Sequence, residues 1–376
     1  MTVLPELWRT QTLDEVVELR RGFDLPTHSR REGPFPVLSA GVTAGWHDEG
    51  PIKGPGLVVG RATNLGVPTW SEGDFWPLNT TLYAADFHGN SPRFVFHLFE
   101  SMDLSGFDSG SVQPMLNRNY IAKLKVAVPP LSEQRAIAEV LGALDDKIAA
   151  NRKLVETADQ LASSLFRDAA AQGSVEVELR EVAELITRGV APKYTEDETE
   201  LLVLNQKCVR DQRVNLGPAR RTLQTKVPAA KRLRANDVLV NSTGAGTLGR
   251  VARWVSDLDA TVDSHVSIVR FGSDRVDPVC AGFAVLHVEP MIEMMGEGST
   301  GQTELSRDQL GKLRLRFVAR EREAEVSGKL AALTATSVAH IAENGNLATL
   351  RDTLLPRLMS GELRVRDAEH EVEEVL

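Results

Sequence analysis

The sequence predicts an α+β protein with two similar mixed α/β domains, separated by two long helices that pair as an antiparallel coiled coil. Three observations support this fold class. Blocks of residues recur in the same order in both halves, short apolar runs fill each domain, and a helical apolar spacing follows each domain. The predicted segments are a first domain over 1–130, a first helix over 131–170, a second domain over 171–318, a second helix over 319–361 and an acidic tail over 362–376 that is expected to be disordered.

The two halves carry an internal repeat. Each half opens on a similar block that leads to an Arg-Gly pair, Arg21-Gly22 in the first half and Arg188-Gly189 in the second. The matching blocks are Leu13–Leu19 with Leu179–Leu185, Leu116–Leu124 with Leu305–Leu313, and Ile148–Leu154 with Ile341–Leu347. Because these matches keep their order over most of the chain, we expect an internal duplication.

Short strands are expected inside each domain. Gly56–Gly60 and Asp237–Asn241 are brief apolar runs between turn-forming residues, which is typical of buried strands. Val262–Arg270 shows a roughly alternating apolar pattern, which also predicts a strand.

Helical spacing begins after Pro129-Pro130, with Ser132 expected to cap the first helix. The apolar seam and the asparagines that interrupt it comprise Ile137, Leu141, Leu144, Ile148 and Asn151 in the first helix, and Leu330, Leu333, Ile341, Asn344, Leu347 and Leu354 in the second. The two asparagines either pair and fix the register or face solvent. The offset between the halves grows by four residues inside the helices, which shifts a coiled-coil seam locally. A helix of about 40 residues is about 60 Å long and would act as a spacer.

Composition bounds the class of protein. The chain has 376 residues and two cysteines, which do not make a disulfide framework, so a reducing cytoplasm is expected. No export signal is apparent, and the longest apolar stretch is about half of a membrane span. The net charge of −9 argues against nucleic acid at first sight, but part of the acidity lies in the final residues.

A basic stretch lies in the second half. Residues 205–253 hold eleven Lys or Arg against two carboxylates. This stretch is either a solvated face or a surface that contacts phosphates, and its clustering beside the strands favours phosphate contact. Arg210, Asn241 and His265 are of residue types that can also read base edges.

Gly244–Gly249 matches the Gly-x-Gly-x-x-Gly fingerprint of dinucleotide-binding proteins. That fingerprint requires a helix to start inside the glycines, whereas the residues that follow here are strand-like. We therefore expect a tight turn, which is either structural or presents Ser242, Thr243 and Thr247 to a phosphate or a base edge.

Motifs of catalysis are missing from the sequence. There is no Gly-x-Ser-x-Gly elbow, no Gly-Lys-Ser/Thr phosphate loop and no His-Glu-x-x-His. An Asn/Asp-Pro-Pro-Tyr/Phe motif, which amino-methyltransferases use to hold a target base, is absent as well. No catalytic residue, metal ligand or cofactor site is therefore expected in this chain.

Several blocks resemble type I restriction–modification specificity subunits. Val128–Arg135 and the leucine-rich helix after it are similar to the central conserved region of that family, and Leu350–Gly361 is similar to its C-terminal conserved region. Gly110–Gln113 and residues 237–270 resemble parts of its target-recognition domains. The second copy of the Pro-Pro-Leu-Ser-Glu-Gln block departs from the pattern, because it reads Val318–Glu323 and lacks the prolines.

The resemblance implies that each domain reads one half of a bipartite, asymmetric site in double-stranded DNA, and that the paired helices set the gap. It also implies that two methyltransferase subunits, which carry the S-adenosylmethionine chemistry, dock on the helices, and it leaves open a motor–nuclease subunit. No membrane contact is implied. The candidate DNA-binding residues are Arg61, Asn64, Asn79, Thr80, Thr81, Ser111, Gln113, Lys207, Arg210, Asn241, Ser242, Thr243, Thr247, Arg250, Ser264, His265, Thr300 and Gln302. The seam residues named above are the candidates for the spacer and for docking.

Two other functions fit parts of the sequence. A protein–protein scaffold would use two β-rich binding domains on a coiled coil. A stand-alone enzyme would use the glycine-rich turn, which a ligand-binding measurement on the lone chain tests.

Overall fold

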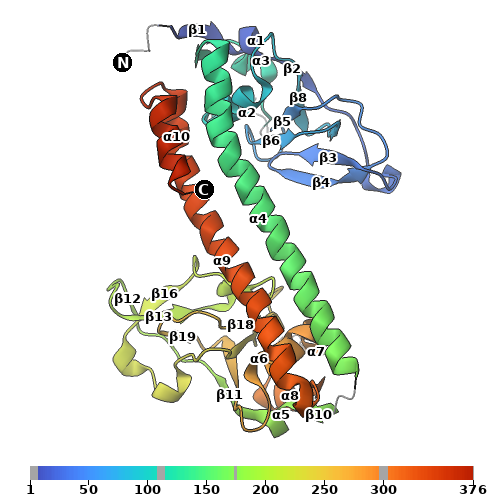
Figure 1. Ribbon diagram of the computed structural model, residues 1–376, viewed down its shortest axis with the longest axis vertical. Coiled ribbons are helices and arrows are strands. Elements are labelled where there is room, and N and C mark those ends of the chain that lie inside the picture. The colour runs from blue at the N-terminus through green and yellow to red at the C-terminus, as the bar shows by residue number, and fades with distance from the viewer. Residues whose placement is uncertain (1–6, 108–114, 173–175, 296–303, 376) are drawn as a thin grey trace. The chain divides into compact units, whose positions relative to one another are not determined.

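The computed structural model describes residues 7–107, 115–172, 176–295 and 304–375. The chain divides into two compact units, the first made of Met1–Arg152 with Ile341–Leu376 and the second of Lys153–His340. Both boundaries fall inside long helices, α4 (Leu131–Ala171) and α9 (Arg320–Met359). Each unit therefore contains a sheet-rich domain and a segment of each long helix (Figure 1).

The sheet-rich domain of the first unit is built on a four-stranded antiparallel sheet of order β2-β8-β5-β6. A three-stranded sheet of order β4-β3-β7 and a β1-β9 pair complete it. The elements are β1 (Arg9–Thr12), α1 (Leu13–Val16), β2 (Glu18–Arg21), β3 (Phe35–Ser39), β4 (Val42–His47), β5 (Gly56–Gly60), β6 (Pro68–Ser71), β7 (Trp76–Pro77), β8 (Thr81–Asp86), α2 (Pro92–Glu100), α3 (Arg118–Ile121) and β9 (Lys125–Val128), with a 3₁₀ turn at Thr27–Ser29. Alternate residues of β5 enter different cores: Leu57 and Val59 pack in the cluster of α2 and α4, while Val58 packs with the small sheet.

The second unit repeats this plan with a four-stranded sheet of order β11-β20-β17-β18. A second sheet has the order β12-β16-β13-β19, and β10 pairs with β21. The elements are β10 (Glu176–Glu178), α5 (Leu179–Val182), β11 (Ala183–Arg188), β12 (Tyr194–Thr195), β13 (Leu201–Leu204), β14 (Val209–Arg210), β15 (Arg213–Val214), β16 (Arg220–Thr222), β17 (Val238–Asn241), β18 (Val251–Arg253), β19 (Ala260–Val262), β20 (Val266–Phe271), α6 (Pro278–His287), α7 (Glu289–Met295), α8 (Arg307–Gly311) and β21 (Arg314–Arg316), with 3₁₀ turns at Gln206–Cys208, Gln224–Lys226 and Ala229–Lys231.

The same backbone contacts recur in both units, which confirms the internal duplication. Gly22 N donates to Thr81 O at 3.1 Å, and Gly189 N donates to Val266 O at 3.0 Å. Both glycines are required by close approach, because a Cβ atom would lie 2.2 Å from Leu78 O at Gly22 and 2.1 Å from Val262 O at Gly189. The Arg-Gly pairs of the repeat therefore mark one structural position in two copies.

The sheet of the second unit contains a buried ion pair. The side chains of Arg270 and Asp237 are 4% and 1% exposed. Arg270 Nε donates to Asp237 Oδ1 at 2.8 Å, and Arg270 Nη2 donates to Asp237 Oδ2 at 2.6 Å. The guanidinium also donates to the carbonyl oxygens of Ala230 and Arg232, so the buried charge is well satisfied.

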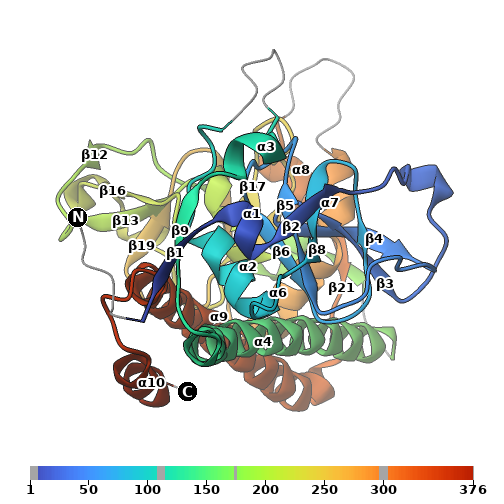
Figure 2. The ribbon, with the colours of Figure 1, turned by 90° about the horizontal axis from the view of Figure 1, so that it is seen from above.

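The long helices pack in antiparallel fashion within each unit (Figures 1 and 2). In the first unit, the early seam residues of α4 share a core with late residues of α9: Ile137, Leu141, Leu144 and Ile148 with Leu347, Leu354 and Leu358. In the second unit, late residues of α4 share a core with early residues of α9: Ala162 and Phe166 with Val326, Leu330 and the half-buried Leu333. The predicted coiled coil is therefore confirmed, and α9 continues three residues beyond Pro356.

Three expectations about the helices need correction. Ile341 is 44% exposed and not in the seam, because the four-residue offset between the halves turns it away from the position of Ile148. The first helix begins at Leu131, so Ser132 lies in its first turn, and Pro130 O accepts from the amides of Glu133 and Gln134. The third expectation, a disordered tail over 362–376, is wrong for the described residues 362–375.

Those last residues form a helix, α10 (Val365–Glu373). Ala368 and Val372 are buried in the core of the first unit, and Val365 packs against it. Because these residues recur at spacings of three and four, they line one face, and the acidic side chains that suggested disorder occupy mostly the other.

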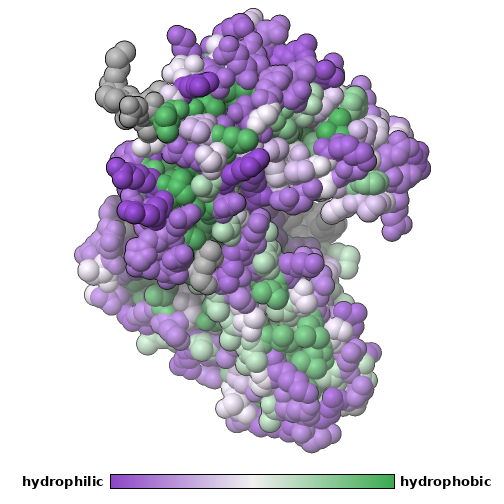
Figure 3. Space-filling view, turned by 45° about the horizontal axis from the view of Figure 1, so that its top comes forward, coloured by the Kyte–Doolittle hydropathy of each residue, from purple (hydrophilic) through white to green (hydrophobic). Residues whose placement is uncertain are grey.

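The surface is mostly hydrophilic with small hydrophobic patches on the face that Figure 3 shows. Among the described residues, no single helix has both the length and the apolar composition needed to cross a membrane, and only the bent pair α6–α7 passes when its helices are counted together.

Candidate nucleic-acid interface

The candidate residues of the first unit gather where β5 ends and β8 begins. Arg61 follows β5, and its backbone N–H donates to Thr80 O at 2.9 Å. Asn79 and Thr80 are half-buried on the loop before β8, and the Asn79 amide donates to Asp24. Asn64 is exposed in the turn after Arg61, where its φ of 44° is left-handed.

Thr81 was predicted to face DNA, but its side chain is fully buried. Its hydroxyl donates to Leu78 O at 2.8 Å. The residue opens strand β8, where alternation turns it inward, so it supports the loop rather than the surface.

The second unit builds the same sheet end with different side chains. Ser242 N donates to His265 O at 2.9 Å, as Arg61 N does to Thr80 O. Ser264 and His265 are exposed on the loop before β20, and Thr243 Oγ1 lies 2.7 Å from His265 Nδ1. The candidates Thr243 and His265 therefore contact each other, and Ser264 is exposed beside His265 on the same loop.

Two further candidates in this unit are buried and cannot meet a ligand. Asn241 is 0% exposed, and its amide donates to the carbonyl oxygens of Gln206 and Thr247. Ser242 is also 0% exposed, and its hydroxyl lies 2.6 Å from that of Ser267. Asn241 ends strand β17 and Ser242 follows it, and both are held inside the fold at the start of the glycine-rich turn.

The glycine-rich turn leads into strand β18. A dinucleotide-binding fingerprint would lead into a helix, so the turn lacks the structure that this fingerprint requires. Within it, Arg250 Nη2 donates to Gly246 O at 2.8 Å. Thr247 is half-buried, and its Oγ1 lies within 3.4 Å of Gly244 O. The side chains of Thr247 and Arg250 therefore stabilise the turn itself.

The basic stretch of residues 205–253 supplies less free charge than its composition suggests. Lys207 and Arg210 are exposed, and Arg210 lies 3.4 Å from Asp211. Most of the other cations are engaged within the second unit: Arg213 with Asp159, Arg221 with Glu200 O, Lys231 with Gly189 O, Arg232 with Asp259 and Arg234 with Glu184. Ser111, Gln113, Thr300 and Gln302, which were also candidates, lie outside the described residues.

Sequence reasoning missed two arginines at the sheet end of the first unit. Arg21, Arg61 and Arg118 line one pocket of about 340 Å³ together with Leu82 and residues 115–117. Burial and the neighbouring Arg21 charge both lower the pKa of Arg61. The signal for Arg21 was the Arg-Gly pair of the repeat, whereas the sequence gave no comparable signal for Arg118.

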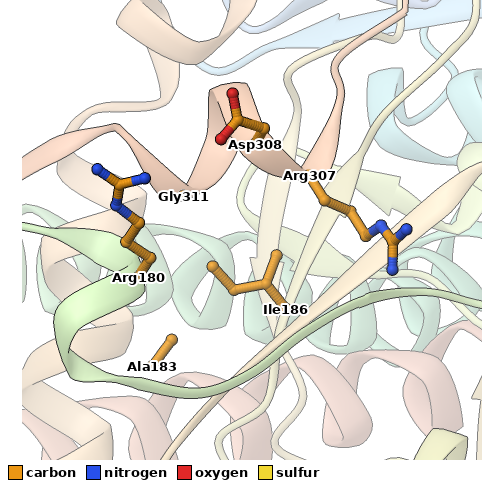
Figure 4. Close-up of a pocket in the computed structure, with 6 residues that line it drawn as sticks. All are labelled: Arg180, Ala183, Ile186, Arg307, Asp308 and Gly311. Atoms are coloured by element: carbon orange, nitrogen blue, oxygen red, sulfur yellow. The ribbon is translucent and has the colours of Figure 1, made fainter.

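The corresponding arginine of the second unit is Arg188, and it is engaged. Its guanidinium donates to Glu304 Oε1 at 2.8 Å and to the carbonyl oxygens of Leu305 and Ser264. A pocket of about 370 Å³ lies nearby, where charged side chains from α5 and α8 surround Ile186 (Figure 4). Its Arg180 is paired with Glu178 at 2.6 Å.

His97, Glu100 and Asp145 of the first unit have the residue types and spacing of a metal site. Two arginines already neutralise Asp145, since Arg351 Nη1 lies 2.9 Å and Arg93 Nη2 lies 3.6 Å from its oxygens. His97 Nδ1 is 2.8 Å from Glu100 Oε2. A divalent cation would meet two guanidinium charges here, so this cluster joins α2 to the long helices instead.

The two helical asparagines pair with each other. Asn151 is 1% exposed, and its Nδ2 donates to Asn344 Oδ1 at 3.1 Å and to Glu343 Oε2 at 2.8 Å. Lys147 Nζ lies 3.1 Å from Glu343 Oε1. Of the two alternatives, pairing or exposure to solvent, the structure therefore shows pairing, in a buried polar layer of the seam.

Together these features define a class of protein: a duplicated α+β chain whose two domains present polar sheet ends and are built around an antiparallel coiled coil. Residues 5–158 match the family described as type I restriction modification DNA specificity domain. This match covers the sheet-rich domain of the first unit and the beginning of α4, and it confirms the resemblance seen in the sequence.

One known protein is similar to this chain in sequence and another is similar in fold. A stretch of 143 residues is 27% identical to the type I restriction enzyme EcoprrI specificity subunit of Escherichia coli, covering 36% of this chain and 36% of that protein. The fold is similar to that of the type I restriction–modification system S subunit from M. genitalium, with a TM-score of 0.68 and 15% identity over 96% of this chain and 98% of that one.

Proposed function

We propose that this chain is the DNA sequence-specificity subunit of a type I restriction–modification complex, and that each sheet-rich domain reads one half of a bipartite, asymmetric site. One observation carries the proposal. The two units hold the same loop with the same backbone hydrogen bonds, yet present Asn79 and Thr80 in one and Ser264 and His265 in the other. Sequence is read by side chains at base edges, so a shared frame with different side chains suits two readers of different half-sites.

The long helices would set the gap between half-sites and dock two methyltransferase subunits. Leu154 and Leu161 support a docking role, since they are 50% and 55% exposed on one face of α4 at a spacing of two helical turns. S-adenosylmethionine would be bound by the methyltransferase subunits, and this chain would supply recognition without catalysis. A motor–nuclease subunit would join the same assembly for restriction.

A domain exchange tests the two-reader proposal. Residues 1–130 are replaced by the corresponding segment of a relative, and methylated sites in the host genome are mapped by methylation-sensitive sequencing. We expect one half of the recognised site to change and the other half to remain. An unchanged pattern, or a change in both halves, would contradict the assignment of one half-site to each domain.

A helix extension tests the spacer role. One heptad is inserted in both helices at the boundary of the units, after Arg152 in α4 and before Ile341 in α9, so that the seam keeps its face. We expect the gap between half-sites to lengthen while the half-sites themselves stay the same. A heptad inserted in only one helix serves as the control, because it misaligns the seam and should abolish methylation.

Substitution of the exposed leucines tests docking. Leu154→Asn and Leu161→Asn change side chains that are half exposed, so the fold should be retained. We expect weaker association with the purified methyltransferase subunit in sedimentation experiments, with unchanged melting of the lone chain. Full association of the double variant would remove this face from the docking surface.

A further inference from the structure

The first unit contains a pocket lined by three arginines, Arg21, Arg61 and Arg118, which we call the arginine pocket. None of the three belongs to the helix seam or to the buried core of the sheet. Arg21 and Arg118 are exposed, Arg61 is half-buried, and all three line the same pocket of about 340 Å³. Arg21 comes from the end of β2, Arg61 from the turn after β5 and Arg118 from the start of α3. Three segments distant in sequence thus line one pocket with arginines, and the charge of Arg21 acts on Arg61.

The charges of this pocket are not neutralised by the described part of the chain. Among the described residues, no carboxylate forms an ion pair with Arg21, Arg61 or Arg118, and Arg118 donates only to the carbonyl oxygen of Leu19 at 3.3 Å. Other arginines of the same unit are paired, such as Arg20 with Glu18 at 2.8 Å. Like charges held together repel one another unless an anion lies between them.

The second unit lacks this arrangement at the equivalent position. Arg188, which matches Arg21, is paired with Glu304 at 2.8 Å. Ser242 occupies the position of Arg61 and is fully buried. The fold therefore does not need three unpaired cations there, because Arg188 is neutralised and Ser242 carries no charge.

We propose that Arg21, Arg61 and Arg118 form a phosphate-binding site of the first unit, which holds one phosphodiester of the DNA backbone and has no counterpart in the second unit. This inference rests on the proposed function. Guanidinium groups bind phosphate oxygens in fork geometry, and three of them surround a single anion without reading any base. The site therefore positions the duplex, and sequence reading is left to the neighbouring loop.

The test measures binding of the full chain to two duplexes, one carrying the methylated site of its own complex and one of random sequence, over a range of salt. Arg21→Gln and Arg61→Gln should each weaken binding about tenfold on both duplexes at low salt. The slope of log affinity against log salt should fall by about one. The preference for one duplex over the other should not change.

Arg20→Gln is the matched control. Arg20 neighbours Arg21 on β2, so its side chain points to the opposite face of the sheet. It should leave both the affinity and the salt slope as in the unaltered chain. Melting temperatures of all three variants are compared, so that loss of folding is not mistaken for loss of binding.

The outcomes separate this site from the proposed function. Unaltered DNA affinity and salt slope in both Arg21→Gln and Arg61→Gln would overturn the phosphate site. A loss of affinity confined to the specific duplex would also overturn it, because it would make Arg61 a reader of bases. If the unaltered chain shows no preference between duplexes, the proposed function fails, while equal losses on both duplexes still support the phosphate site. Inorganic phosphate that stabilises the unaltered chain but not Arg61→Gln, without any change in duplex binding, would assign the site to free phosphate and overturn its use for DNA.

Discussion

Removing the Asn151 side chain should destabilise the first unit more than its small size suggests. Asn151 is 1% exposed and donates two hydrogen bonds, one to the neutral Asn344 amide and one to the Glu343 carboxylate. A neutral hydrogen bond contributes about 1 kcal/mol and one to a charged group about 2 kcal/mol. Asn151→Ala should therefore lower the free energy of unfolding by about 3 kcal/mol. Asn344→Ala also loses a long hydrogen bond from Asn344 Nδ2 to Ile148 O at 3.4 Å, so it should lower that free energy by about 1–2 kcal/mol.

A double-mutant cycle measures the pairing itself. Asn151→Ala, Asn344→Ala and the double variant are unfolded in urea and followed by tryptophan fluorescence, since four of the five tryptophans (Trp8, Trp46, Trp70 and Trp76) lie in the first unit. We expect a coupling energy of about 1 kcal/mol. Arg152→Ala, an exposed neighbour on α4, is the control and should change stability by less than about 0.5 kcal/mol. A coupling energy below about 0.3 kcal/mol would refute the argument that this layer fixes the register.

Three more predictions concern the two cores. Arg270→Met leaves the Asp237 carboxylate buried without its arginine partner, so calorimetry should show the free energy of unfolding of the second unit falling by about 3–5 kcal/mol while the first unit melts as before. A second unit that melts at the same temperature in the variant and in the unaltered chain would contradict this. Deleting residues 362–376 removes α10 from the first-unit core, and the urea midpoint of that unit alone should fall, since burial of Val372 by itself contributes about 1.5–3 kcal/mol. Burial raises the pKa of the Cys280 thiol to about 12, so it should resist thiol reagents near about pH 8 in the folded chain and react after unfolding in urea; fast labelling of the folded chain would show that this core opens.

The fold was largely predictable because its main signals are periodic. Apolar spacing predicted both long helices, and the repeat predicted two similar domains. The same signals failed inside α9, where the spacing differs from that of the first copy. Ile341 carries the same motif as Ile148 yet is exposed, because a four-residue offset rotates one helix face relative to the other copy.

The candidate site was predicted in part. A sequence indicates where strands end near turns, but it does not indicate which side chains at those ends are buried. Thr243 and His265, both candidates, contact each other. Asn241 and Ser242, one or two positions away, turn inward and bond to the backbone. Pairing between distant charges was also out of reach: Arg188 and Glu304 are 116 residues apart, and only the fold brings them together.

The division of the chain has a consequence for its synthesis. The second unit is complete once His340 has been made, whereas the core of the first unit still lacks Leu347, Leu354, Ala368 and Val372. At about 5–20 residues per second, the residues after His340 take roughly 2–7 seconds to follow. During that time the nascent first unit exposes the apolar face that α9 and α10 later cover. A chain released early would thus carry a finished second unit beside an unfinished first one.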